Sequence, residues 1–228
     1  MSDFEQKNVV VVAAHPDDEV LGVGGTIQKH IRKGRSVTVI YVTDGFYGDA
    51  DDDMVSSKRK NATDAMNILG VTDIIFLGFK GLRLDSYKKS LLNSTLTDTF
   101  KKIKPKIVYT HHWGDVNFDH EIVFDMTIVA CRPHRGMTID ALYTYETLSS
   151  TEWAAPNRDS SFLPNTFVIL DDEAVSLKVA ALEQYVTEIF DYPHPRSSQG
   201  IRVLAQHRGL MISEEFAEAF HLVRHINR

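Results

Sequence analysis

Hydrophobic and polar residues in the first third of the chain alternate between two patterns. Uninterrupted apolar segments at 9–14 and 37–42 are typical of strands that are buried on both faces. Between them, Val23, Ile27 and Ile31 recur at helical spacing, and Gly34 stands where a helix would end. The pattern predicts a strand, a helix and a second strand.

The same alternation continues to about residue 135. Helical periodicity predicts helices at 56–69, 88–103 and 119–131, and short apolar segments predict strands at 73–77 and 107–110. Alternating strands and helices of this length form parallel sheets that helices cover, with right-handed crossovers. We therefore predict an α/β fold of three layers.

The last third of the chain has a different character. Strands are predicted at 139–145 and 166–170, a helix at 173–185, and a loop rich in Pro, Ser and Arg at 192–200. Ser213 is predicted to cap a final helix, with two glutamates in its first turn. Because no linker is evident, we predict a single domain, 1–228, with a core at 1–135 and a C-terminal elaboration at 136–228.

Composition narrows the range of partners. The formal net charge of −6 argues against nucleic acid or an anionic membrane as the main partner. A single cysteine, Cys131, excludes an intramolecular disulfide, and no apolar run approaches the roughly 20 residues that span a bilayer. We therefore expect a cytoplasmic protein without stable membrane insertion. Assembly into a homo-oligomer is left open.

Four chemically active side chains follow the first predicted strand directly: His15, Asp17, Asp18 and Glu19. Crowded carboxylates resist simultaneous ionisation unless a cation offsets their charge. Imidazole nitrogen and carboxylate oxygen suit Zn²⁺, and other divalent metals are an alternative. One aspartate could then hold the metal while the other accepts a proton from the water that the metal activates.

A second polar cluster, 115–120, begins the helix that follows the strand at 107–110. The carboxyl ends of parallel strands meet at one edge of a sheet, so His120 is expected near His15. These two histidines and one of the aspartates would supply three ligands and leave a fourth position for water, as in a catalytic zinc site. The alternative is that these residues merely cap helices or lie on the surface.

Three sequence features resemble the LmbE-like, or PIG-L, family. The first is Ala-His-Pro-Asp-Asp-Glu at 14–19, the second the glycines at 22, 24 and 25, and the third Asn-Phe-Asp-His at 117–120. The resemblance implies a Rossmann-like fold and zinc-dependent removal of N-acetyl groups from glucosaminyl compounds. It also implies that His15, Asp18 and His120 hold the zinc and that Asp17 is the general base.

The resemblance extends to further residues but is incomplete. It implies that Asp119 orients a neighbouring group and that Arg59 binds substrate. Asn117 stands where many members have a histidine that helps to stabilise charge on the acetyl oxygen. Gly81 lies near a position where many members carry an aspartate that holds a sugar hydroxyl. The departures leave the metal ligands in place and the substrate open.

The C-terminal elaboration contains two segments, 146–153 and 192–197, that resemble family members associated with polysaccharide biosynthesis. We interpret them as a substrate wall, in which Trp153 stacks on a sugar face and Arg196 pairs with a phosphate. The alternative is ordered loop structure built on prolines and Ser/Thr turns.

The leaving amine must receive a proton, and the amide side chain of Asn117 cannot deliver one at neutral pH. His194 lies between two prolines, next to an arginine, and its ring can both donate a hydrogen bond and deliver a proton. We therefore predict that His194 shares the catalytic role with Asp17. The rivals are His111, His112 and the protonated form of Asp17 itself.

Three functions remain for comparison. The first is a zinc-dependent hydrolase that removes the N-acetyl group from an amino sugar, or from a glycoside, sugar-nucleotide or lipid-linked derivative. The second is an amidase of the same family acting on a non-acetyl amide, of the thiol-conjugate type. The third is a non-catalytic metal-binding domain. The presence of Asp17 beside the ligands disfavours this alternative, because metal binding alone does not require Asp17. A nicotinamide enzyme is disfavoured because G-x-G-x-x-G is missing.

Overall fold

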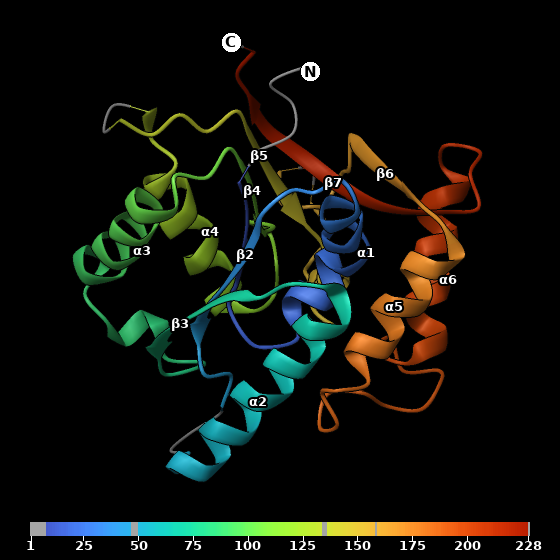
Figure 1. Ribbon diagram of the computed structural model, residues 1–228, viewed down its shortest axis with the longest axis horizontal. Coiled ribbons are helices and arrows are strands. Elements are labelled where there is room, and N and C mark those ends of the chain that lie inside the picture. Colours follow the sequence, from blue (N-terminus) through green and yellow to red (C-terminus); the bar gives the residue numbers. More distant parts are fainter. Residues whose placement is uncertain (1–7, 47–49, 134–135, 158, 228) are drawn as a thin grey trace.

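A mixed seven-stranded sheet forms the centre of the protein in the computed structural model, which describes residues 8–46, 50–133, 136–157 and 159–227 (Figure 1). The strand order is β3-β2-β1-β4-β5-β7-β6, and the first five strands in this order are parallel. The strands are β1 (Val9–Ala13), β2 (Val37–Thr43), β3 (Asp73–Phe79), β4 (Ile107–His111), β5 (Ala141–Tyr145), β6 (Thr166–Leu170) and β7 (Phe216–His225).

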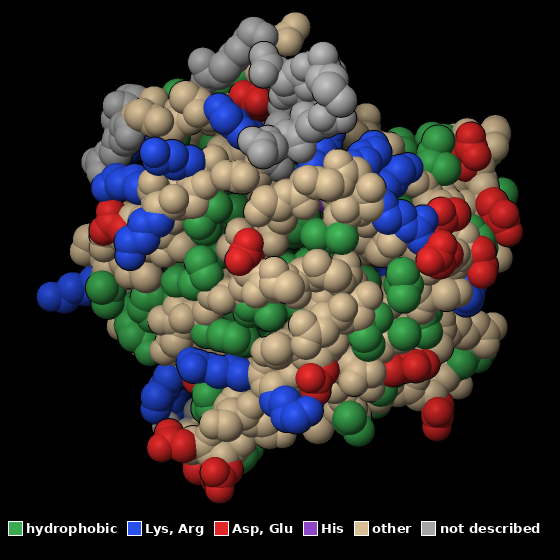
Figure 2. Space-filling model, viewed as in Figure 1, with side chains coloured by type: hydrophobic (Ala, Val, Ile, Leu, Met, Phe, Trp, Pro, Cys, Tyr) green, Lys and Arg blue, Asp and Glu red, His purple; other side chains and the backbone are tan. Residues whose placement is uncertain are grey.

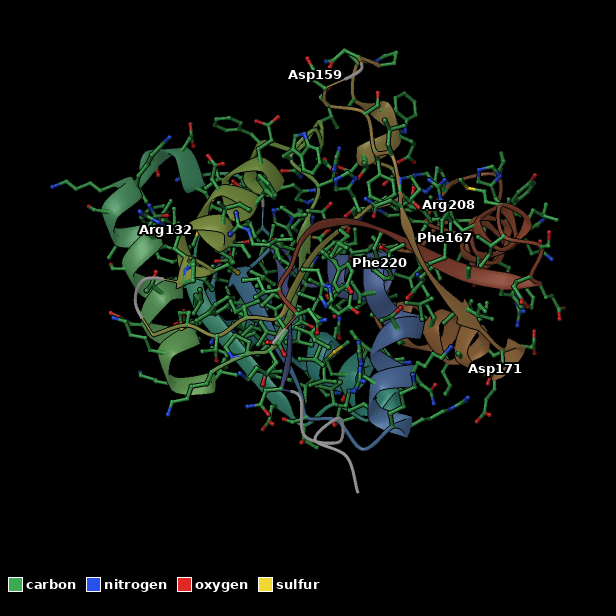
Figure 3. All side chains as sticks on the ribbon, turned by 90° about the horizontal axis from the view of Figure 1, so that it is seen from above. Arg132, Asp159, Phe167, Asp171, Arg208 and Phe220 are labelled. Atoms are coloured by element: carbon green, nitrogen blue, oxygen red, sulfur yellow. The ribbon has the colours of Figure 1, made fainter. Side chains whose placement is uncertain are left out.

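Helices cover both faces of this sheet. One face packs against α1 (Asp18–Arg32), α2 (Asp52–Leu69) and α5 (Asp172–Leu182). The other packs against α3 (Lys89–Ile103) and α4 (Phe118–Ala130). The last helix, α6 (Ser198–Leu210), lies against β7 and α5. In the view from above, α3 and α4 (green) lie on one side of the sheet, and α1 (blue), α5 and α6 (orange to red) lie on the other (Figure 3). The three-layer α/β fold predicted from the sequence is confirmed.

The central strand β1 shows why the apolar run in the sequence has no alternation. Val9 and Val11 belong to the core beneath α1, α2 and α5, whereas Val10 and Val12 belong to the core beneath α3 and α4. All four side chains are fully buried. Because both faces of β1 are covered, every position favours a β-branched apolar residue.

The predicted final helix after Ser213 is wrong. Residues 216–225 form β7, which pairs antiparallel with both β5 and β6, so the sheet is mixed and not purely parallel. Ser213 has a φ of 60° and lies in the turn before the strand. The Ser213 hydroxyl and the two glutamates after it are typical of a helix start. The hydrogen bonds of 216–225 to two neighbouring strands stabilise a strand instead. The helix α6 was also not predicted from the sequence.

The surface carries charges of both signs. On the face shown in Figure 2, acidic and basic side chains are interspersed with polar and apolar ones. Within the described ranges, no helix is both long and apolar enough to cross a membrane.

Candidate metal centre and active site

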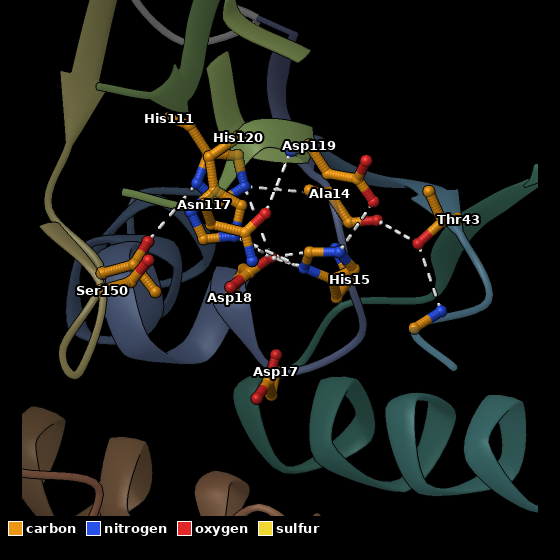
Figure 4. A network of polar contacts seen from close by, with 12 residues as sticks. Ala14, His15, Asp17, Asp18, Thr43, His111, Asn117, Asp119, His120 and Ser150 are labelled. Carbon is orange, nitrogen blue, oxygen red and sulfur yellow. Dashed lines mark hydrogen bonds and ion pairs between the residues drawn. The ribbon is translucent and has the colours of Figure 1, made fainter. Parts of the chain in front are cut away.

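The predicted metal ligands converge at the carboxyl ends of β1 and β4 (Figure 4). His15 lies two residues after the end of β1, Asp18 begins α1, and His120 lies in the first turn of α4. The Pro16–Asp17 turn is short, so it brings the imidazole of His15 and the carboxylate of Asp18 together. The start of α4 brings His120 across from the neighbouring strand.

The three ligand atoms form a nearly equilateral triangle. Nδ1 of His15 lies 3.2 Å from Oδ2 of Asp18. Nε2 of His120 lies 3.4 Å from the same oxygen and 3.4 Å from Nδ1 of His15. Ligands bound tetrahedrally at the usual zinc distances of about 2.0–2.1 Å are about 3.3–3.4 Å apart. The donor atoms are therefore spaced like one face of a tetrahedral zinc site.

Two further features of these residues fit a bound cation. Oδ1 of Asp18 is buried and has no hydrogen-bond partner within the described residues. A buried carboxylate oxygen without a partner is costly, and a metal ion beside it would offset that cost. The donor set of two imidazoles and one carboxylate is also one that catalytic zinc sites use. His15, Asp18 and His120 thus fit the metal that the sequence predicts.

The outer ring nitrogens of both histidines face carboxylates. Nε2 of His15 lies 3.2 Å from Oδ2 of Asp119, and Nδ1 of His120 lies 3.2 Å from Oδ1 of Asp115. Burial lowers the pKa of each imidazole, but these carboxylates and Asp18 outweigh it and raise the pKa to about 10 for His15 and about 9 for His120. The surroundings therefore favour positive charge at both rings. Carboxylates in this position orient metal-ligating histidines.

Both supporting carboxylates are themselves fixed. Asp119 accepts hydrogen bonds from the backbone amides of Leu82 at 2.6 Å and Leu84 at 3.2 Å. Asp115 accepts hydrogen bonds from the hydroxyls of Ser150 and Thr151 and from one backbone amide. The orienting contact expected of Asp119 is present in the structure. Asp115 was not assigned from the sequence, although it lies within the polar cluster 115–120.

The carboxylate of Asp17 pairs with a residue outside the triangle, as a group with a separate task would. It occupies the N-cap of α1 with a φ of 132°, and its carboxylate makes no capping bond. Instead, Oδ2 accepts a hydrogen bond of 2.7 Å from Nη1 of Arg196. Burial raises the pKa of Asp17 to about 7, although Arg196 opposes the shift. A carboxyl group with such a pKa is populated in both protonation states near neutral pH.

Arg196 links Asp17 to the C-terminal part of the chain. Its guanidinium donates to Oγ of Ser149 at 2.6 Å and lies 3.4 Å from Oε2 of Glu188. Glu188 also pairs with the ammonium of Lys58. Charges of alternating sign therefore run from Asp17 through Arg196 and Glu188 to Lys58. Neither Glu188 nor Lys58 was singled out from the sequence.

The predicted substrate-binding residues lie in different settings. Arg59 stacks on the ring of Phe76, with 5.0 Å between its guanidinium carbon and the ring centroid. Its neighbour Lys58 is the residue that points toward Glu188. Trp153 is 71% exposed and so is accessible to a ligand. Asn117 caps α4, its side-chain oxygen accepting from the amide of Asp119 at 3.0 Å.

The histidines proposed as proton donors also differ. His194 is half-buried, contacts Phe190, and accepts a hydrogen bond from the amide of Arg196 at 3.1 Å through Nδ1. His111 is fully buried, and its Nε2 accepts from the amide of Ala14 at 2.9 Å. Burial, with His120 nearby, lowers the pKa of His111 to about 4. A neutral ring whose Nε2 is already an acceptor is a poor acid, which weakens the case for His111.

His112, the third histidine considered as an acid, contacts residues outside the ligand triangle. Its Nε2 contacts the carbonyl of Ser160 at 2.8 Å, and its ring packs against Trp113 and Phe162. These contacts give His112 a structural role between β4 and the segment near residue 160.

Comparison with known proteins bears on the same region. Residues 10–131 match the family model of the GlcNAc-PI de-N-acetylases, PIG-L. The "uncharacterized deacetylase YaiS" of Escherichia coli K12 is 30% identical over 186 residues, which cover 79% of this chain and 91% of that protein. A 1D-myo-inositol 2-acetamido-2-deoxy-alpha-D-glucopyranoside deacetylase of a Nocardioides species is 37% identical over 98 residues. That match covers 38% of this chain and only 32% of the relative.

Two other proteins are similar to this chain, one in sequence and one in structure. The 4-oxalmesaconate hydratase of Pseudomonas putida is 28% identical over 133 residues, covering 53% of this chain and 50% of that protein. The N,N'-diacetylchitobiose deacetylase of Pyrococcus horikoshii has the same fold, with a TM-score of 0.77 and 21% identity over 95% of this chain and 84% of that chain. The model match over more than half of the chain, together with the similarity to YaiS, shows that the chain belongs to the PIG-L family.

Proposed function

We propose that the protein is a zinc-dependent hydrolase that removes the N-acetyl group from an amino sugar or one of its glycosides. The observation that carries this proposal is the triangle of His15, Asp18 and His120 with Asp17 beside it. The family model is named for a GlcNAc-PI de-N-acetylase, and the Nocardioides relative acts on an acetamido sugar, which supports an N-acetylated sugar as substrate.

The residues of this chain divide the work in the following way. A zinc ion held by His15, Asp18 and His120 would supply Lewis-acid activation of water and of the acetyl carbonyl. Asp17 accepts a proton from the attacking water as the new C–O bond forms. As the C–N bond breaks, the leaving nitrogen takes up a proton, which Asp17 or His194 provides. Products are acetate and the free amine.

Arg196 suits the recognition of polar substrate groups near Asp17. Arg196 is held by Asp17 and Ser149, so its guanidinium is oriented before substrate arrives. A fixed guanidinium binds anionic oxygens with little loss of side-chain entropy. Trp153, exposed on a short helix (Thr151–Trp153), offers an aromatic surface on which a sugar ring could stack.

Acetate release from a panel of substrates tests this function. The panel contains N-acetylglucosamine, N,N'-diacetylchitobiose, a GlcNAc-inositol glycoside and a nucleotide-linked GlcNAc, each with zinc-loaded protein. We expect stoichiometric acetate and free amine from at least one of them. A thiol-conjugate amide and 4-oxalmesaconate are included to test the amidase and hydratase activities. Turnover of either of these without acetate release from any sugar would contradict the proposal.

A further inference from the structure

Asp17 is held in a backbone conformation that residues with a side chain rarely adopt. Its φ is 132°, and the residue is 4% exposed. An aspartate at a helix N-cap ordinarily has an extended backbone, and its carboxylate accepts from an amide of the first turn. Asp51 and Asp171 do so at the starts of α2 and α5, and the hydroxyl of Ser197 accepts in the same way at the start of α6. Asp17 departs from that arrangement, so its surroundings must stabilise the strained form.

Glu19 makes the contact that holds this backbone. Its Oε2 accepts a hydrogen bond of 3.0 Å from the amide of Asp17, while its Oε1 accepts from the hydroxyl of Tyr185. The hydroxyl of Tyr185 in turn lies 3.2 Å from that of Tyr41. Glu19, Tyr185 and Tyr41 are at most 1% exposed. The carboxylate of Glu19 is thus fixed by residues from β2 and from the segment after α5.

This arrangement directs the carboxylate of Asp17. If the amide of Asp17 were free to rotate, the residue would relax toward an ordinary N-cap, and its carboxylate would turn to the amides of α1. With the amide bound by Glu19, the carboxylate remains beside Arg196 and next to the metal ligands. The geometry of the base is therefore set by buried residues.

We propose that Glu19, supported by Tyr185, is a positioning residue that keeps Asp17 in the orientation required for deacetylation. The inference rests on the proposed function, because it assigns Asp17 the role of the base. It differs from a purely structural role for Glu19, in which the residue would only stabilise the start of α1.

Two substitutions of Glu19 separate these roles. Glu19→Gln keeps an oxygen that accepts from the Asp17 amide and gains an NH₂ group that donates to Tyr185. Glu19→Leu keeps the bulk and removes both bonds. We expect kcat within about threefold of wild type for Glu19→Gln. For Glu19→Leu we expect a loss of about 100-fold, because displacements of about 1 Å can have effects of that size.

Measurements besides kcat make the distinction sharp. KM and the dissociation constant for zinc should stay within about threefold of wild type in both variants, since neither bond of Glu19 is to a ligand atom or to Arg196. A crystal structure of Glu19→Leu should show that the φ of Asp17 has left the positive region. Tyr185→Phe, which removes the donor to Glu19, should lower kcat more than Tyr41→Phe, which leaves that donor in place.

Two results would overturn the inference. One is equal kcat in folded Glu19→Leu and Glu19→Gln, and the other is a loss of zinc affinity parallel to the loss of kcat. If Glu19→Leu does not fold, the pair Tyr185→Phe and Tyr41→Phe provides the test, and equal turnover in that pair would refute the inference. If wild-type protein released no acetate from any sugar, the proposed function would fail, whereas the φ of Asp17 in Glu19→Leu would still test the positioning.

Discussion

Replacing Asp119 with Asn should weaken zinc binding without removing a ligand. Oδ2 of Asp119 lies 3.2 Å from Nε2 of His15 and orients the ring so that Nδ1 faces Asp18. Carboxylates that support a ligating histidine typically contribute about 10- to 100-fold to metal affinity. Asp119 is 2% exposed, so water screens its charge little. We therefore expect the upper part of that range, about 30- to 100-fold, or about 2–3 kcal/mol.

The assay is competition for zinc between the protein and a chromogenic chelator at fixed pH. Asp125→Asn is the matched control, because Asp125 lies on the same helix, α4, but is exposed. Asp125→Asn should bind zinc like wild type. Thermal unfolding of the metal-free proteins shows whether Asp119→Asn keeps the fold, since Asp119 also accepts from the amides of Leu82 and Leu84. A folded Asp119→Asn with wild-type affinity would refute the role assigned to this contact.

Three further predictions follow from the same structure. Asp17→Asn should retain one zinc per chain and lose about 10²- to 10⁴-fold in kcat, the usual contribution of a general base; near wild-type turnover would remove Asp17 from that role. His194→Ala should reduce turnover and alter the alkaline limb of its pH profile with metal content unchanged; an unaltered profile would leave Asp17 as the only acid. Burial, with Arg35 and Lys33 nearby, lowers the pKa of His30 to about 3, whereas in the unfolded chain it is about 6.5. Below pH 6.5 the unfolded state binds a proton that the folded state does not, so acid lowers stability. Between pH 8 and pH 5, wild type should lose about 2 kcal/mol more unfolding free energy than His30→Gln. Parallel curves for the two proteins in chemical denaturation would contradict this.

The sequence predicts the parallel part of the fold well because its signals are local. The strand β1 is an unbroken apolar run, and α1 has apolar residues at helical spacing before Gly34. The strand β7 could not be recognised in this way. Its hydrogen bonds come from β5 and β6, which lie far away in the sequence, whereas the local signal at Ser213 imitates a helix cap.

In the candidate site, too, the residues with local sequence signals are predicted, and the contacts between distant residues are not. The residues 15–19 form one compact motif, and 117–120 begin a recognisable helix, so their convergence follows from the rule for parallel sheets. Contacts of Asp17 with Arg196, and of Lys58 with Glu188, join residues separated by 179 and 130 positions. Nothing local in the sequence encodes such pairs. Whether Lys58 or its neighbour Arg59 contacts Glu188 depends on which side of α2 faces the C-terminal part, and the packing of α2 on α5 determines that.

Titration of metal-free protein with zinc, while acetate release from the best sugar substrate is measured, tests the central claim most directly. We expect no turnover without metal, a linear rise with added zinc, and a plateau at one zinc per chain. His120→Ala should show no such rise over the same range, because it removes one of the three ligands. Full turnover in the metal-free protein, or an unchanged titration in His120→Ala, would contradict the account.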